Sequence, residues 1–178
     1  VLERFVFQSP APRVVFGRGT LNAIGDELKL HGISRGFILC SGSGLEFAER
    51  IVKAAPGCAL RIMRLTSSAI TKQDFDAATA YIQEADANGF IGIGGGTPIG
   101  LSKSLAANTR LPWIALTTTY SGSEMASNWT YGSGKDQRSG AGQAALPATA
   151  IYDPELTLGL PPKMSGQSGM NAMAHAVE

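Results

Sequence analysis

Short apolar segments alternate along this chain with longer amphipathic ones, and this alternation constrains the fold more than any other feature. The segments at residues 36–40, 90–93 and 113–116 have the length and composition of buried strands. Residues 60–65 alternate in strand fashion, and residues 147–154 contain one more short strand. Apolar side chains at helical spacing mark residues 20–30, 45–55, 71–87 and 99–107. Buried strands connected through helices are typical of parallel sheets. The sequence therefore predicts an α/β fold with a Rossmann-like parallel sheet and flanking helices.

Two segments depart from this alternation. Residues 4–8 and 13–16 alternate in strand fashion on either side of a Pro-rich turn, which predicts an N-terminal β-hairpin at a sheet edge. Residues 127–145 are rich in Gly, Ser and charged side chains, which indicates an exposed excursion with hairpin character.

The last segment predicts a second structural unit. Met170, Met173 and Val177 form an apolar stripe on a helix, and no Gly or Pro closes that helix before the sequence ends. We therefore expect residues 1–160 to form the α/β domain and residues 161–178 to begin the helical domain of a longer protein.

Charge and composition exclude several classes of partner. The 178 residues hold 15 Lys and Arg against 14 Asp and Glu, a net charge of +1, whereas nucleic-acid and membrane-surface binders usually carry a basic excess. No apolar run approaches the roughly 20 residues that span a bilayer, and no secretory leader is recognisable. Cys40 and Cys58 lack metal-binding spacing, so we expect two free thiols in a reducing, cytoplasmic compartment.

The strongest local signal is a run of three glycines, Gly94, Gly95 and Gly96, directly after the apolar run at 90–93. We call this run the glycine loop. We expect Thr97 to cap the helix that follows and Pro98 to hold its first position. Glycines let a backbone approach a ligand closely, and the free N–H groups of a helix start favour a phosphate. A tight turn without a ligand is the alternative.

Two common nucleotide fingerprints do not fit this loop. The GxGxxG motif, counted from Gly92, requires Gly or Ala where Thr97 stands. The P-loop requires Lys directly after its second glycine, where Leu101 stands. Lys103 lies about one turn into the helix, and it either reaches a phosphate or is solvated.

A second polar loop follows the strand expected at 113–116. It carries Thr118, Thr119 and Ser123, and because the carboxyl ends of parallel strands share one rim, we expect it near the glycine loop. Local turn and cap hydrogen bonds are the alternative for the threonines. Asn171 and His175 are four residues apart and share a helix face, but a carboxamide is a poor transition-metal ligand, so a structural histidine is the alternative there.

Several motifs together resemble the iron-containing alcohol dehydrogenase superfamily, and within it the maleylacetate reductases. They are the Gly94–Thr97 loop, the Thr-Thr-Tyr-Ser-Gly-Ser-Glu run at 118–124, and the segments at 151–154, 158–162 and 168–178. The likeness runs over the whole chain and matches the N-terminal half of such proteins. It implies a dehydroquinate synthase-like N-terminal domain, with an all-helical C-terminal domain absent from this chain.

The resemblance also implies roles for individual residues. Gly94, Gly95 and Gly96 would carry the cofactor pyrophosphate, and the remaining cofactor-binding residues would be Thr97, Thr118, Thr119, Ser123 and Leu156. Asn171 and His175 would be catalytic-site residues facing the cleft. Metal-dependent members carry Asp where Asn171 stands, so the likeness implies a metal-independent site. Gly42 replaces an acidic residue that binds the adenosine ribose in many relatives, so NADPH should be tolerated as well as NADH.

The implied activity is the NADH- or NADPH-dependent reduction of the maleylacetate C=C bond to 3-oxoadipate, in the catabolism of aromatic compounds. A homodimer is expected, and this chain alone should bind cofactor without turnover. The alternatives are a metal-dependent alcohol or glycerol dehydrogenase, a dehydroquinate-synthase-like lyase, and a nucleotide-binding module without catalysis.

Overall fold

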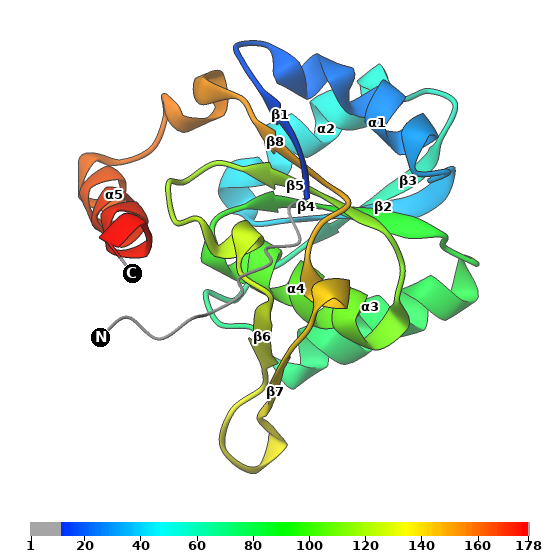
Figure 1. Cartoon of the computed structure of the whole chain (residues 1–178). Coiled ribbons are helices and arrows are strands. Elements are labelled where there is room, and N and C mark those ends of the chain that lie inside the picture. Colours follow the sequence, from blue (N-terminus) through cyan, green and yellow to red (C-terminus); the bar gives the residue numbers. More distant parts are fainter. Residues whose placement is uncertain (1–11, 178) are drawn as a thin grey trace, which may run out of the picture.

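The computed structural model describes residues 12–177 and confirms the parallel α/β architecture (Figure 1). Six strands form one sheet in the order β1-β8-β5-β4-β2-β3, and every neighbouring pair is parallel. The strands are β1 (Arg13–Phe16), β2 (Arg35–Cys40), β3 (Ala59–Arg64), β4 (Gly89–Gly94), β5 (Trp113–Thr117) and β8 (Thr149–Tyr152). The central strands β2, β4 and β5 are almost wholly buried, as their unbroken apolar runs require.

Helices cover both faces of this sheet (Figure 1). They are α1 (Ile24–Leu30), α2 (Leu45–Ala54), α3 (Lys72–Glu84) and α4 (Gly96–Thr109). One hydrophobic cluster joins α1 and α2 to the sheet through residues such as Leu28 and Ile51. A second cluster, with Phe75 and Leu105, joins α3 and α4 to the other face.

The strand order reverses between β2 and β4. These two strands are hydrogen-bonded neighbours, yet the helix after β2 and the helix after β4 lie on opposite faces of the sheet. The chain therefore leaves the carboxyl ends of these two strands toward opposite faces of the sheet. Such a switch point is where open α/β sheets bind their ligands.

The N-terminal hairpin is tested only in part. Its first strand, at 4–8, lies outside the described residues. Its second strand is β1, which lies at a sheet edge as expected and pairs with β8 in parallel. The excursion at 127–145 contains the predicted hairpin, formed by β6 (Asn128–Tyr131) and β7 (Arg138–Ala141), which are antiparallel.

The final helix, α5 (Pro162–Val177), lies to one side of the α/β layers (Figure 1). Its apolar stripe is exposed: Met170 is 65% and Met173 61% accessible. A helical domain beginning at residue 161 remains a prediction. None of the helices in residues 12–177 has the length and hydropathy needed to span a membrane.

A buried polar network lies where β1 and β8 begin, at the rim of the sheet opposite the glycine loop. The Glu27 carboxylate, 5% exposed, accepts from Arg13 Nε at 3.0 Å and from Thr149 Oγ1 at 2.8 Å. The Thr149 hydroxyl also meets His31 Nε2 at 2.7 Å. Burial alone raises the pKa of Glu27, but the hydrogen bonds from Arg13 and Thr149 outweigh it and hold this pKa below its usual value.

Thr149→Val should destabilise the fold by about 1.5 kcal/mol, because it removes a buried hydroxyl that has two partners while keeping the side-chain shape. Urea unfolding measures the loss. Thr130→Val, which replaces an exposed threonine of strand β6, is the matched control and should stay within about 0.5 kcal/mol of the wild type. Equal stabilities for the two variants would contradict a structural role for the network.

Candidate nucleotide-binding and active site

The glycine loop lies at the switch point and is shaped for close approach. β4 ends at Gly94, whose φ of +138° is accessible to glycine and strained for other residues. A Cβ on Gly95 would lie 2.7 Å from Cγ2 of Thr119, so the neighbouring loop closes over it. A Cβ on Gly96 would meet nothing within 4 Å. The loop is therefore packed on one side and open at Gly96.

The open side coincides with the N-terminus of α4. This helix runs for 14 residues from Gly96, and its first N–H groups have no intrahelical acceptor. Together with the positive end of the helix dipole, such N–H groups bind phosphate. The open glycine loop and the start of α4, which lie together at the switch point, thus fit the pyrophosphate of a dinucleotide.

The expected cap at Thr97 is wrong. The N-cap of α4 is Gly95, and no side chain caps the helix. Because Gly94 turns the chain immediately after the strand, α4 begins at Gly96 and leaves Thr97 and Pro98 at the second and third helical positions. The Thr97 hydroxyl instead donates to the Ser68 carbonyl at 2.7 Å.

The loop that follows β5 carries Thr118, Thr119 and Ser123, and we call it the threonine loop. It lies beside the glycine loop. The N–H of Thr118 donates to the Gly94 carbonyl at 3.1 Å, and the Thr119 methyl group faces Gly95. The expectation that the two loops share one rim is therefore confirmed by their contacts. Whether Thr118 and Thr119 bind cofactor remains a prediction.

Lys103 follows neither alternative suggested by the sequence. Its side chain is 3% exposed, and its Nζ donates to the Ser123 carbonyl at 2.8 Å, so it is neither solvated nor directed at the helix start. Burial lowers the pKa of Lys103 to about 8, opposed by the charge of Glu124. The predicted cofactor residue Ser123 therefore contributes its carbonyl to Lys103, and α4 is tied to the threonine loop.

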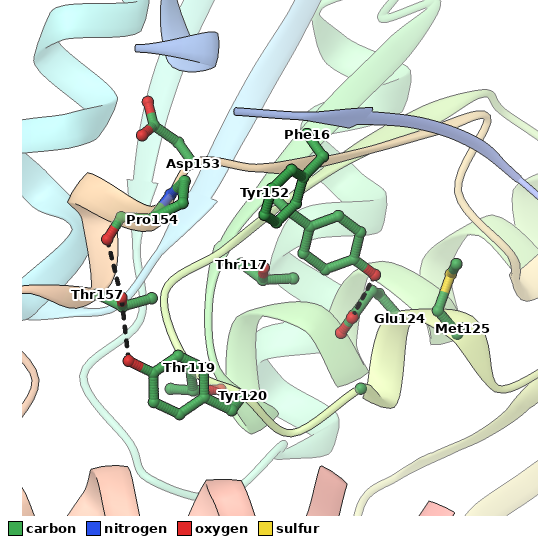
Figure 2. Close-up of a pocket in the computed structure, with 11 residues that line it drawn as sticks. Phe16, Thr117, Thr119, Tyr120, Glu124, Met125, Tyr152, Asp153, Pro154 and Thr157 are labelled. Atoms are coloured by element: carbon green, nitrogen blue, oxygen red, sulfur yellow. Dashed lines mark hydrogen bonds between the residues drawn. The ribbon is translucent and has the colours of Figure 1, made fainter. Parts of the chain in front are cut away.

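The motifs at 118–124 and 151–154 contain Glu124 and Tyr152, but the sequence assigned neither residue a role. Glu124 is 2% exposed and accepts a hydrogen bond from the Tyr152 hydroxyl at 2.7 Å, as Figure 2 shows. Burial and the neighbouring Glu124 charge raise the pKa of Tyr152 well above its usual range. No local pattern marks a buried carboxylate, because its partners come from the distant elements α4 and β8.

A cavity of about 480 Å³ opens beyond the carboxyl ends of β1, β5 and β8. Its wall includes Glu124, Tyr152 and Thr119, and on one side Tyr120 donates to Thr157 at 3.2 Å (Figure 2). Thr157 donates in turn to the carbonyl of Pro154 at 2.9 Å. The cavity adjoins the threonine loop and is large enough for a small organic substrate.

The three remaining candidate residues are Asn171, His175 and Leu156, and the structure describes the side chains of only Asn171 and Leu156. Asn171 Nδ2 donates to the Ser121 carbonyl at 2.6 Å, which joins α5 to the threonine loop. His175 lies one turn further on α5, and its side chain falls outside the described part of the structure. Leu156 is 4% exposed and belongs to the core cluster below α1 and α2, so its contact with a cofactor remains a prediction. The described side chains contain no group of three His, Cys, Asp or Glu suited to a metal.

Comparison with known proteins agrees with this geometry. A profile described as iron-containing alcohol dehydrogenase matches residues 11–154. The maleylacetate reductase of Pseudomonas sp. (strain P51) is 38% identical over 174 residues, which are 98% of this chain and 49% of that protein.

Solved structures show the same relationship. The maleylacetate reductase of Agrobacterium tumefaciens superposes with a TM-score of 0.91 at 31% identity, over 99% of this chain and 51% of that one. The maleylacetate reductase of Rhizobium sp. strain MTP-10005 gives a TM-score of 0.91 at 32% identity, with the same two coverages. The chain thus spans about half the length of these relatives. It belongs to the iron-containing alcohol dehydrogenase family.

Proposed function

We propose that this chain is the cofactor-binding half of an NAD(P)H-dependent maleylacetate reductase, which converts maleylacetate to 3-oxoadipate in the catabolism of aromatic compounds. The observation that carries the proposal is the glycine loop at the start of α4, open at Gly96 and placed at the switch point of the sheet. The similarity of the whole chain to maleylacetate reductases supports the choice of substrate.

The chain's residues have two tasks in this reaction. The N–H groups at Gly95, Gly96 and Thr97 hold the pyrophosphate, and the threonine loop orients the cofactor against the cavity. A bound nicotinamide supplies the hydride that adds to the C=C bond. The carbon of that bond that lies next to the ketone then takes up a proton.

We base the proposal of a metal-free site on the residue at position 171. A carboxylate there would provide an oxygen ligand for a divalent cation, whereas the Asn171 amide is neutral and donates to the Ser121 carbonyl. We propose that Asn171 and His175 face the substrate and hold no metal. The runner-up, a metal-dependent alcohol or glycerol dehydrogenase, would need a different ligand set.

Maleylacetate-dependent oxidation of NADH or NADPH by the natural-length protein, assayed after EDTA treatment, tests this function. We expect full activity in EDTA, because no metal takes part in the proposed site. Activity that returns only with a divalent metal and an alcohol substrate would establish the dehydrogenase instead. Size-exclusion chromatography with light scattering on the same sample tests the proposed homodimer, which a monomeric mass would exclude.

A further inference from the structure

We propose that Arg64 binds the 2′-phosphate of the cofactor and makes this protein prefer NADPH to NADH. This inference rests on the nucleotide-binding part of the proposed function. It assigns a specificity-determining role to a side chain that none of the sequence motifs includes.

Arg64 ends β3, the edge strand beside β2, and reaches the loop that follows β2. The sheet register pairs Arg64 with Cys40, the last residue of β2. A Cβ built on Gly42 would lie 3.1 Å from a terminal guanidinium nitrogen of Arg64. The guanidinium therefore occupies the space into which a side chain at position 42 would project.

The loop at Gly42 lies next to the strand that leads into the glycine loop. β2 is the direct neighbour of β4, which leads into the glycine loop. A Cβ on Gly44 would lie 3.5 Å from the Ile93 carbonyl oxygen, so the loop touches the end of β4. In dinucleotide folds, the end of the strand next to the glycine-loop strand meets the adenosine ribose, where an acid binds the 2′-hydroxyl of NAD or an Arg binds the 2′-phosphate of NADP.

The positive charge of the Arg64 guanidinium has no acidic partner among the described residues. Within residues 12–177, the Arg64 guanidinium forms no side-chain hydrogen bond or ion pair. Burial raises the pKa of the adjacent Cys40 thiol, which keeps that thiol neutral at pH 7. An exposed guanidinium without a partner matches a phosphate in charge and in its forked geometry, and Gly42 adds no carboxylate that would repel it.

Isothermal titration calorimetry with NADP⁺ and NAD⁺, on the natural-length protein without substrate, tests the role of Arg64 directly. These ligands differ only in the 2′-phosphate. We expect the wild type to bind NADP⁺ about tenfold more tightly than NAD⁺. Arg64→Ala should weaken NADP⁺ binding about tenfold or more and leave NAD⁺ binding within about twofold, with Arg64→Lys in between.

Arg61→Ala is the matched control, because Arg61 is exposed on the same strand but lies over the Tyr81 ring. It should leave both affinities unchanged. Equal wild-type affinities, or an equal loss of both ligands in Arg64→Ala, would overturn the inference while leaving the proposed function standing. If neither nucleotide binds to the wild type, the nucleotide-binding part of the proposed function fails together with the inference.

Discussion

Gly96→Asp should lower the affinity for NAD⁺ and NADP⁺ by about 100-fold or more while the protein stays folded. The aspartate would enter the open side of the glycine loop, where its Cβ meets nothing within 4 Å. Its carboxylate would then compete with the cofactor pyrophosphate for the N–H groups at the start of α4 and repel it. Because acidic residues are favourable in the first turn of a helix, α4 itself should lose no stability.

Calorimetric titration measures this loss, and thermal unfolding verifies the fold. Gly57→Asp is the matched control: Gly57 also has open space around its Cβ, but it precedes β3 and therefore lies at the opposite rim of the sheet. It should bind both nucleotides as the wild type does. A folded Gly96→Asp protein that retains full affinity would show that the pyrophosphate is bound elsewhere.

Lys103 should make the protein more stable as the pH rises from 8 to 10.5. Burial lowers the pKa of Lys103 to about 8 in the folded protein, against 10.5 for an ordinary lysine. Between these values the unfolded chain binds more protons than the folded one, so the free energy of unfolding increases with pH. Across this range the free energy of unfolding rises by an amount on the order of 3 kcal/mol. Below pH 8 Lys103 is charged in both states, and the destabilisation from burying its charge has its full value.

Urea unfolding of the wild type and of Lys103→Met at several pH values isolates this effect from other titrating groups. The stability difference between the two proteins should shift in favour of the wild type by about 3 kcal/mol between pH 7.5 and 10.5. Lys53→Met, which replaces an exposed lysine of α2, is the control and should run parallel to the wild type. A pH-independent difference for Lys103→Met would mean that this ammonium group is not desolvated.

The sequence alone predicted most of the elements and the position of the glycine loop. Unbroken apolar runs such as residues 90–93 are characteristic of buried parallel strands, and the amphipathic spacing at 71–87 is characteristic of a surface helix. Both signals depend on residues only a few positions apart. Turn chemistry is similarly local, so three glycines after a strand sufficed to indicate a close-approach loop.

The same local rules failed where a side chain's partner is distant in the sequence. Thr97 looked like a helix cap, but its hydroxyl reaches Ser68, which an earlier loop brings to the start of α4. Lys103 is held by a carbonyl 20 positions away. Both outcomes depend on how the loops pack once the sheet has formed.

By itself, then, the sequence determined the α/β class, the glycine loop and the resemblance to a family. The tertiary structure alone decided that β2 and β4 are neighbours, that Lys103 is buried against the Ser123 carbonyl, and that the Arg64 guanidinium lies beside Gly42. The physical reason is that periodicity and turn preferences act within about ten residues, whereas strand order is set by burying both faces of the sheet at once.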